Sequence, residues 1–172
     1  MNNFFTDIRK LFLIRHAKSS WKFPELDDHD RPLNKRGKRD APLIADILKE
    51  KKIIPDLILS STAVRALKYA EILAGKLDYG KKNIKASRDY YFADLNEIIK
   101  VIRSVSNNYN NVFFIGHNPE ITYLANFLSG KDVNNIPTSG VFGLKYDIND
   151  WSELDENNGK FNLFYYPKLF LK

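Results

Sequence analysis

Short apolar runs rich in β-branched and aromatic residues recur along this 172-residue chain, and helical patterns separate the earlier ones. This alternation constrains the fold strongly, because strands that alternate with helices build a largely parallel sheet between helical layers. The expected strands are residues 11–14, 57–59, 112–115, 141–146 and 161–166. We therefore predict an α/β fold, a three-layer α/β/α sandwich with a mostly parallel central sheet.

Four helices are expected between these strands. The first follows Asn34, a suitable N-cap, although Pro42 is expected to interrupt or kink its early turns. The second begins after Thr62, and the third lies near residues 95–105, where apolar residues follow helical spacing. The fourth begins at Asn118-Pro119, where the asparagine is expected to cap the exposed amides and the proline fits the first turn.

Composition narrows the class of protein further. With 172 residues and 44% hydrophobic content, residues 1–172 are expected to form a single domain. The chain has no cysteine, which excludes disulfides, thiolate metal sites and a cysteine nucleophile. The N-terminal sequence lacks the order of a signal peptide and no apolar run reaches membrane-spanning length, so we expect a cytoplasmic protein.

Basic residues outnumber acidic ones by 27 to 21, and the net charge is +6. Much of the excess lies in short clusters at residues 35–39, 49–52 and 81–82. A basic surface attracts anions of any kind, but charged helix faces and loops explain such clusters equally well. Because no nucleic-acid-binding motif accompanies the charge, we do not expect nucleic acid as a partner.

Three of the expected strands are followed by residues suited to binding phosphate. Arg15 and His16 follow the first strand, Arg65 lies in the first helical turn after the second, and His117 follows the third. If these strands are parallel neighbours, the four side chains meet at one edge of the sheet. Guanidinium groups bind phosphate oxygens in paired hydrogen bonds, and helix N-terminal amides also favour anions. The sequence thus predicts a phosphate pocket.

The chain also resembles the histidine phosphatase superfamily, the phosphoglycerate-mutase-like enzymes, and most closely its SixA-type phosphohistidine phosphatases. The segments that carry the resemblance, in family order, are LFLIRHAKSSW at 11–21, DRPLNKRG at 30–37, SSTAVRA at 60–66, GHNP at 116–119 and PTSG at 137–140. The resemblance implies a phosphoglycerate-mutase-like fold and a nucleophilic His16 that is transiently phosphorylated. It also implies that Arg15, Arg65 and His117 bind the transferring phosphoryl group.

The His16 imidazole must attack as the neutral ring, and a backbone carbonyl that accepts from its second nitrogen is expected to fix the tautomer. Ala17 stands where the wider superfamily usually has glycine. A carbonyl there can still orient His16 if the backbone avoids positive φ.

Several further roles stay open. Lys22 either supplies a substrate-binding charge or lies on the surface, and Ser139 and Asn118 are further candidates for substrate binding. His29 falls in a polar run, where a solvated loop or a rim near the substrate is expected. A zinc site that combines the histidines with an aspartate lacks a supporting helical histidine pair, so we expect neither metal nor cofactor.

The segment around Phe92 departs from relatives that place a general acid nearby, because phenylalanine cannot donate a proton. Asp94 or Glu97 either replaces that acid or complements the dipole at a helix N-terminus, and we favour the helix role. An alkoxide leaving group needs protonation, whereas the imidazole of phosphohistidine leaves more readily. The sequence therefore favours phosphohistidine over phosphate esters.

We thus expect a metal-independent phosphatase whose substrate is phosphohistidine on a protein, such as a phosphorelay domain. The intervals between motifs leave room for short loops, and an open pocket would admit a histidine displayed on another protein. A small-molecule phosphomonoesterase is the first alternative. The second is a non-catalytic anion-binding or nucleic-acid-binding protein, which has no need for a nucleophile. Oligomeric state is left open.

Overall fold

The computed structural model describes residues 8–171. The first seven residues, part of the stretch considered for a signal peptide, lie outside that range. Within it, one sheet has the strand order β3-β2-β4-β1-β5-β6. The strands are β1 Arg9–Arg15, β2 Leu57–Ser61, β3 Lys85–Ser87, β4 Asn111–Gly116, β5 Val141–Tyr146 and β6 Lys160–Tyr165. The α-helices are α1 Lys35–Glu50, α2 Val64–Lys76, α3 Asp89–Phe92, α4 Leu95–Arg103 and α5 Glu120–Ser129. Short 3-10 turns are η1 Asp28–Asp30, η2 Lys81–Asn83, η3 Trp151–Glu153 and η4 Pro167–Leu169.

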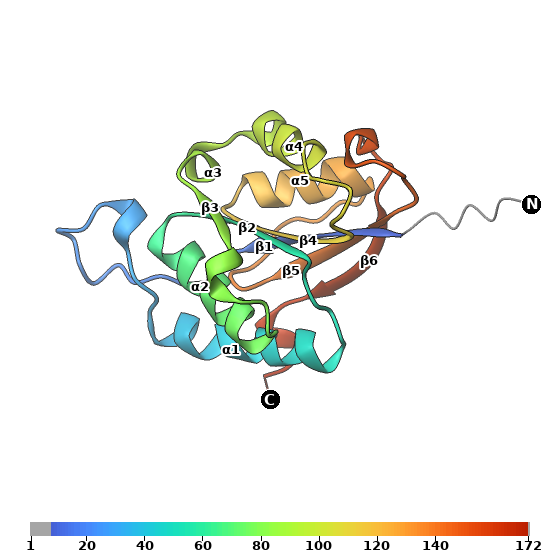
Figure 1. Cartoon of the computed structure of the whole chain (residues 1–172). Coiled ribbons are helices and arrows are strands. Elements are labelled where there is room, and N and C mark those ends of the chain that lie inside the picture. Colours follow the sequence, from blue (N-terminus) through green and yellow to red (C-terminus); the bar gives the residue numbers. More distant parts are fainter. Residues whose placement is uncertain (1–7, 172) are drawn as a thin grey trace, which may run out of the picture.

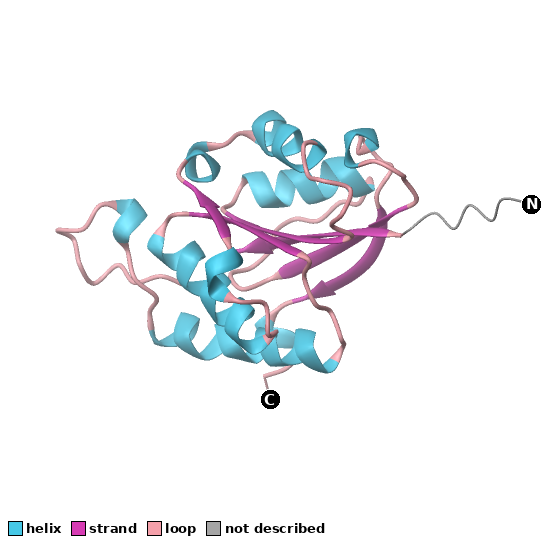
Figure 2. Ribbon diagram, in the orientation of Figure 1, coloured by secondary structure: helices cyan, strands magenta, loops and turns pink. Residues whose placement is uncertain are grey.

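The sheet lies between two helical layers. Helices α1 and α2 cover one face, and α4 and α5 cover the other (Figure 1). Strands β1, β2, β3 and β4 run parallel, whereas β5 pairs antiparallel with both β1 and β6. Figure 2 shows the resulting sandwich of helices around one sheet. The predicted three-layer α/β fold with a mostly parallel sheet is confirmed.

Strand β1 shows how the sequence builds both cores at once. Leu11 and Leu13 pack into the cluster under α4 and α5, while Phe12 and Ile14 pack into the cluster under α1 and α2. Successive strand residues point to opposite faces, so a strand covered on both sides reads as one continuous apolar run. The helices also bury apolar residues against the sheet, and in α1 these include Ile44 and Leu48, which are completely buried.

Three details differ from the sequence-based expectations. Strand β3 was not predicted, because its three residues are largely exposed and carry no apolar pattern. Helix α1 continues through Pro42, so the expected interruption there is wrong. A proline inside a helix costs about 3 kcal/mol. The fully buried Ala41 and Ala45 on either side show that packing against the sheet offsets this cost.

The predicted cap of the fourth helix is also wrong. Pro119 occupies the N-cap position of α5, and no side chain caps the helix. The Asn118 side chain points elsewhere, because its Oδ1 accepts a hydrogen bond of 3.0 Å from Thr122 Oγ1. Among residues 8–171, no helix combines the length and the apolar character needed to cross a membrane.

Candidate active site

The strand order explains why distant segments meet at one place. Strands β2, β4 and β1 are parallel neighbours, and Arg15 at the end of β1 pairs with Gly116 at the end of β4. The next residues, His16 and His117, therefore leave the sheet side by side, with ring centroids 5.1 Å apart. Arg65, in the first turn of α2 after β2, reaches the same edge.

The His16 ring is neutral, with its proton on Nδ1 and none on Nε2. Its Nδ1 lies 2.8 Å from the carbonyl oxygen of Ala17. A carbonyl can only accept, so Nδ1 carries the hydrogen and the lone pair is on Nε2. Burial lowers the pKa of His16 to about 3 even though the Ala17 bond opposes the shift, and the charges of His117, Arg65 and Arg15 lower it further. Ala17 is not among the residues with positive φ, which meets the condition for this contact.

Arg65 bridges the two imidazoles. Its Nε lies 3.4 Å from His16 Nε2, and one terminal nitrogen lies 3.5 Å from His117 Nδ1. Both distances are long for hydrogen bonds, but the side chain is buried and both contacts place a guanidinium donor against a ring nitrogen. The arrangement leaves a cation beside the lone pair of each histidine.

His117 is neutral for related reasons. Because Arg65 only donates, Nδ1 of His117 is the acceptor and its Nε2 donates to Ser61 Oγ at 2.9 Å. Burial and the charge of Arg65 lower the pKa of His117 to about 4. Ser61 also accepts from the backbone amide of Ala63, so the hydroxyl is fixed. Sequence reasoning quoted Ser61 within a motif but gave it no role.

Arg15 lies beside His16, Arg65 and His117, and its side chain forms no hydrogen bond with theirs. Its terminal nitrogen donates to the carbonyl of Ile136 at 2.9 Å and to Asn135 Oδ1 at 3.3 Å. Its Nε is buried and has no hydrogen-bond partner within the described residues. The charge of Arg15 still lowers the pKa of both His16 and His117, so it belongs to the same electrostatic environment.

Asp28 is a site residue that sequence reasoning missed. Asp28 lies in the short turn η1. Its Oδ2 accepts hydrogen bonds from Arg65 at 2.8 Å and from Tyr91 at 2.7 Å, and its Oδ1 accepts one from Arg31 at 2.8 Å. Partial burial opposes ionisation. The hydrogen bonds from Tyr91, Arg31 and Arg65 nevertheless hold the pKa of Asp28 well below its usual range. A permanent negative charge therefore lies against the guanidinium of Arg65.

Tyr91, and not Phe92, is the residue of its segment that reaches the site. The Tyr91 ring lies 5.3 Å from the His117 ring, and its hydroxyl donates to Asp28. Phe92 is 69% exposed. Asp94 and Glu97 form a reciprocal capping box at the start of α4, so both carboxylates serve the helix. Burial and the bond to Asp28 raise the pKa of Tyr91, which makes it a weaker acid than free tyrosine.

The three additional binding candidates lie in different surroundings. Ser139 is buried beside His16, and its backbone amide donates to the His16 carbonyl at 3.1 Å. Its hydroxyl has no hydrogen-bond partner within residues 8–171. Asn118 donates to Asn135 and to the carbonyl of residue 136, the same acceptors that Arg15 uses. Lys22 is exposed and lines a surface pocket with Ser20, away from the two imidazoles.

His29 lies at the rim of the site. Its ring nitrogens contact Asp30 Oδ1 at 2.9 Å and Thr62 Oγ1 at 3.0 Å, and its ring packs edge-on against Tyr91. Within the described range, no group of three or more histidine or carboxylate side chains is arranged to hold a metal ion. The site therefore presents two unprotonated ring nitrogens, His16 Nε2 and His117 Nδ1, beside the guanidinium of Arg65.

Comparison with known proteins identifies the family. The model of the histidine phosphatase superfamily (branch 1) matches residues 11–112, and the chain belongs to this superfamily. It is 31% identical over 153 residues to the uncharacterized chloroplastic protein At3g52155 of Arabidopsis thaliana, covering 84% of this chain and 70% of the relative. It is also 31% identical over 170 residues to the uncharacterized protein ML1117 of Mycobacterium leprae, covering 90% and 100% of the two chains.

Solved structures point to the SixA type within that superfamily. The putative phosphohistidine phosphatase SixA from Agrobacterium tumefaciens matches with a TM-score of 0.76 and 28% identity, over 92% of this chain and 98% of its own. The protein histidine phosphatase SixA complexed with tungstate matches with a TM-score of 0.80 and 22% identity, over 94% and 99% of the chains. The predicted resemblance to SixA-type proteins is confirmed.

Proposed function

We propose that this protein hydrolyses phosphohistidine on another protein through a phosphorylated His16 intermediate. The observation that carries the proposal is that His16 is neutral and buried. Its unprotonated Nε2 lies 3.4 Å from Nε of Arg65. A neutral, buried imidazole beside fixed cations is suited to attack on phosphorus, because phosphoryl transfer depends mainly on positioning and on stabilising charge on the oxygens.

The reaction runs in two displacements. The lone pair of His16 Nε2 attacks phosphorus, the P–N bond of the substrate breaks, and its electron pair returns to the leaving imidazole. When the other ring nitrogen of the substrate is protonated, the product leaves as neutral imidazole without a further proton transfer. Water then attacks the phosphorylated His16, the new P–N bond breaks, and inorganic phosphate and the free ring are released. A proton from that water passes to solvent.

Arg15, Arg65 and His117 are proposed to bind the phosphoryl oxygens. For His117 this requires a proton on Nδ1, which accepts from Arg65 in the structure, and the negative charge of a bound phosphoryl group favours uptake of that proton. Arg15 Nε and Ser139 Oγ support this, since both are buried donors beside His16 without a partner in the described structure. Buried polar groups are nearly always satisfied, and phosphate oxygens are acceptors that fit these donors. Lys22 and Asn118 are less suited to direct contact, because Lys22 lies in a separate pocket and the Asn118 side chain is already hydrogen-bonded.

The leaving group favours a phosphoramidate. Asp94 and Glu97 cap a helix, Asp28 is ionised, and the Tyr91 proton is hydrogen-bonded to that carboxylate. An alkoxide must be protonated as it leaves, and these groups are poorly placed or poorly suited to do so. The similar structure from Agrobacterium tumefaciens, which is described as a putative phosphohistidine phosphatase, agrees with this proposal.

A small-molecule phosphomonoesterase remains the second candidate function. Residues of this chain are 37% identical over 71 positions to phosphoglycerate mutase 1 of Saccharomyces cerevisiae, which covers 40% of the chain and 29% of the mutase. The match covers less than half of either chain. It nevertheless favours testing phosphate esters of small metabolites alongside phosphohistidine.

The test compares turnover of a phosphohistidine peptide with that of sugar phosphates and nucleotides. We expect a preference for the peptide, and His16→Ala should abolish both turnover and incorporation of acid-labile phosphate. Lys100→Ala, a change at an exposed position on α4, is the control and should retain activity. Appreciable turnover by His16→Ala would eliminate the proposed nucleophile, and a large preference for esters would reverse the order of the two functions.

A further inference from the structure

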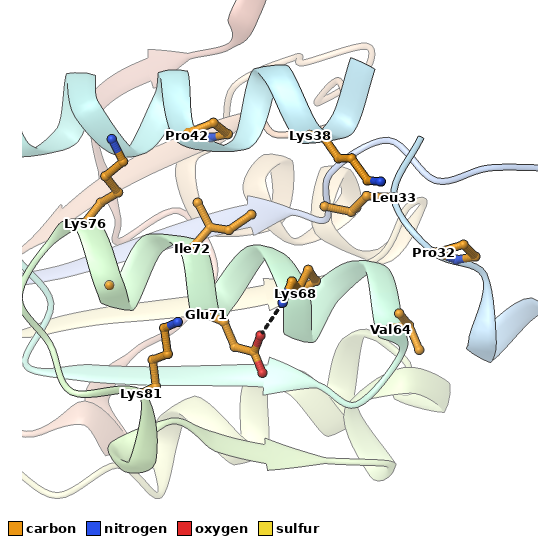
Figure 3. Close-up of a pocket in the computed structure, with 11 residues that line it drawn as sticks. Pro32, Leu33, Lys38, Pro42, Val64, Lys68, Glu71, Ile72, Lys76 and Lys81 are labelled. Atoms are coloured by element: carbon orange, nitrogen blue, oxygen red, sulfur yellow. Dashed lines mark hydrogen bonds and ion pairs between the residues drawn. The ribbon is translucent and has the colours of Figure 1, made fainter. Parts of the chain in front are cut away.

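A surface groove of about 800 Å³ lies between α1 and α2 (Figure 3). The residues that line it do not include those of the candidate active site. Its apolar lining residues are Pro32, Leu33, Pro42, Val64 and Ile72. Its basic lining residues are Lys38, Lys68, Lys76 and Lys81. The groove therefore combines an apolar lining with positive charge.

A second pocket of about 490 Å³ continues this surface, because it shares Pro32, Leu33 and Lys38 with the groove. It adds the cations of Lys22, Lys35 and Arg36. The fold thus gathers basic clusters that are far apart in the sequence around one apolar depression. We call the two pockets together the basic groove.

The positive charge of the basic groove is only partly compensated, because three of its seven cations form ion pairs within the described residues. Among the described residues that line it, Glu71 is the one carboxylate, and it pairs with Lys68 at 3.2 Å (Figure 3). Outside the lining, Asp46 pairs with Lys76 at 2.8 Å and Asp40 pairs with Arg36 at 3.4 Å. Lys38 and Lys81 are exposed and form no ion pair within residues 8–171. A complementary ligand carries negative charge and apolar side chains.

One end of the basic groove is formed by residues next in sequence to those of the candidate active site. Val64 at one end of the groove directly precedes Arg65, and Pro32 closely follows the turn that carries Asp28. From there the groove follows α2 as far as Lys76. At 1.5 Å per residue this stretch of helix is about 18 Å long, which matches about 12 residues of a docked helix.

We propose that the basic groove binds an acidic, amphipathic helical segment of the phosphorylated protein and so presents its phosphohistidine to His16. This proposal rests on the proposed function and adds the chemistry of the partner. The apolar lining favours a protein, because single-stranded nucleic acids are bound by stacking on aromatic side chains and Phe23 is the one aromatic residue in the described lining. In such a segment the glutamate and aspartate side chains would pair with the lysines, and the apolar stripe between them would pack against the apolar lining of the groove.

The test uses two synthetic peptides with the same phosphohistidine, each extended by about 12 residues of amphipathic helix. One extension carries glutamates on its polar face, and the other carries lysines at the same positions. The variant Lys38→Glu/Lys81→Glu should raise KM for the glutamate peptide about tenfold, the scale expected when two surface attractions become repulsions. Its kcat, and its KM for free phosphohistidine, should match those of the wild type.

The matched control is Lys100→Glu/Lys160→Glu, which reverses two exposed charges on other elements and should leave every constant unchanged. Equal KM values for the two peptides in the wild type, or an unchanged KM in the groove variant, would overturn the proposal. If the wild type hydrolyses no phosphohistidine, the proposed function fails separately. Fluorescence anisotropy of the unphosphorylated glutamate peptide then decides the groove. Binding that the groove variant loses supports it, and preferential binding of a single-stranded RNA overturns it.

Discussion

The buried, neutral His16 makes the stability of this protein depend on pH in a definite direction. Burial lowers the pKa of His16 to about 3, whereas a histidine in an unfolded chain titrates near pH ~6.5. Below that pH the unfolded chain binds a proton that the folded chain does not, so acid favours unfolding. The penalty is absent above pH ~6.5 and grows as the pH falls toward the folded pKa.

The size of the effect follows from the two pKa values. Between pH ~7 and pH ~5, the extra proton uptake of the unfolded chain lowers the free energy of unfolding by about 2 kcal/mol. Replacing the ring in His16→Asn removes this contribution. The variant should therefore lose about 2 kcal/mol less than the wild type over the same interval, whatever its stability at neutral pH.

Urea denaturation followed by circular dichroism at both pH values measures this difference. Leu124→Ala is the control, because it removes a fully buried side chain that does not titrate and should keep the pH dependence of the wild type. An identical pH dependence in the wild type and in His16→Asn would refute the reasoning. It would show that the ring binds protons equally well in the folded and the unfolded chain.

Three further changes test individual contacts. Asp28→Ala leaves the buried guanidiniums of Arg31 and Arg65 without their carboxylate, so the free energy of unfolding in urea should fall by about 2 kcal/mol. Vanadate should also bind more weakly, because Arg65 is no longer held in place. Unchanged values would contradict this role of Asp28. Ser61→Ala removes the partner of His117 and should lower kcat/KM for a phosphohistidine peptide about tenfold; full activity would contradict the role of this bond. Because Ser61 also accepts from the Ala63 amide, the change should cost about 1–3 kcal/mol in urea denaturation. Gly37→Ala drives a Cβ into a backbone carbonyl of the loop after β1 and should cost about 1–3 kcal/mol in urea denaturation. Gly75→Ala, whose Cβ meets only a flexible side chain, is its control, and equal stability of the two variants would be the contrary result.

The sequence predicted those site residues that sit directly on strand ends. Arg15, His16 and His117 follow buried runs by one or two residues, and parallel neighbours place such positions together. Arg65 needed only the additional inference that a helix starts after β2. Local patterns were sufficient for these positions because the sheet supplies the long-range geometry.

Asp28 and Tyr91 could not be found in that way. Their contacts join residues 37 and 63 positions apart, and both come from segments whose path depends on tertiary contacts. Asp28 lies in a run of acidic residues that is typical of a solvated loop, and nothing in the local sequence distinguishes Tyr91 from its aromatic neighbours. For similar reasons β3 escaped prediction, since an exposed strand of three residues is defined by its pairing with β2.

Together these contacts divide the site into two parts with different physical origins. The imidazoles and Arg65 are fixed by buried strands and by the start of α2. On the proposed function, the sheet therefore sets the position of the bound phosphoryl group. Asp28 and Tyr91, which contact Arg65 and the His117 ring, come from the segments after β1 and β3. Loops tolerate change more readily than a buried sheet does. On the proposed function, changes in these two segments alter which substrate is dephosphorylated while the phosphorylated His16 step is preserved.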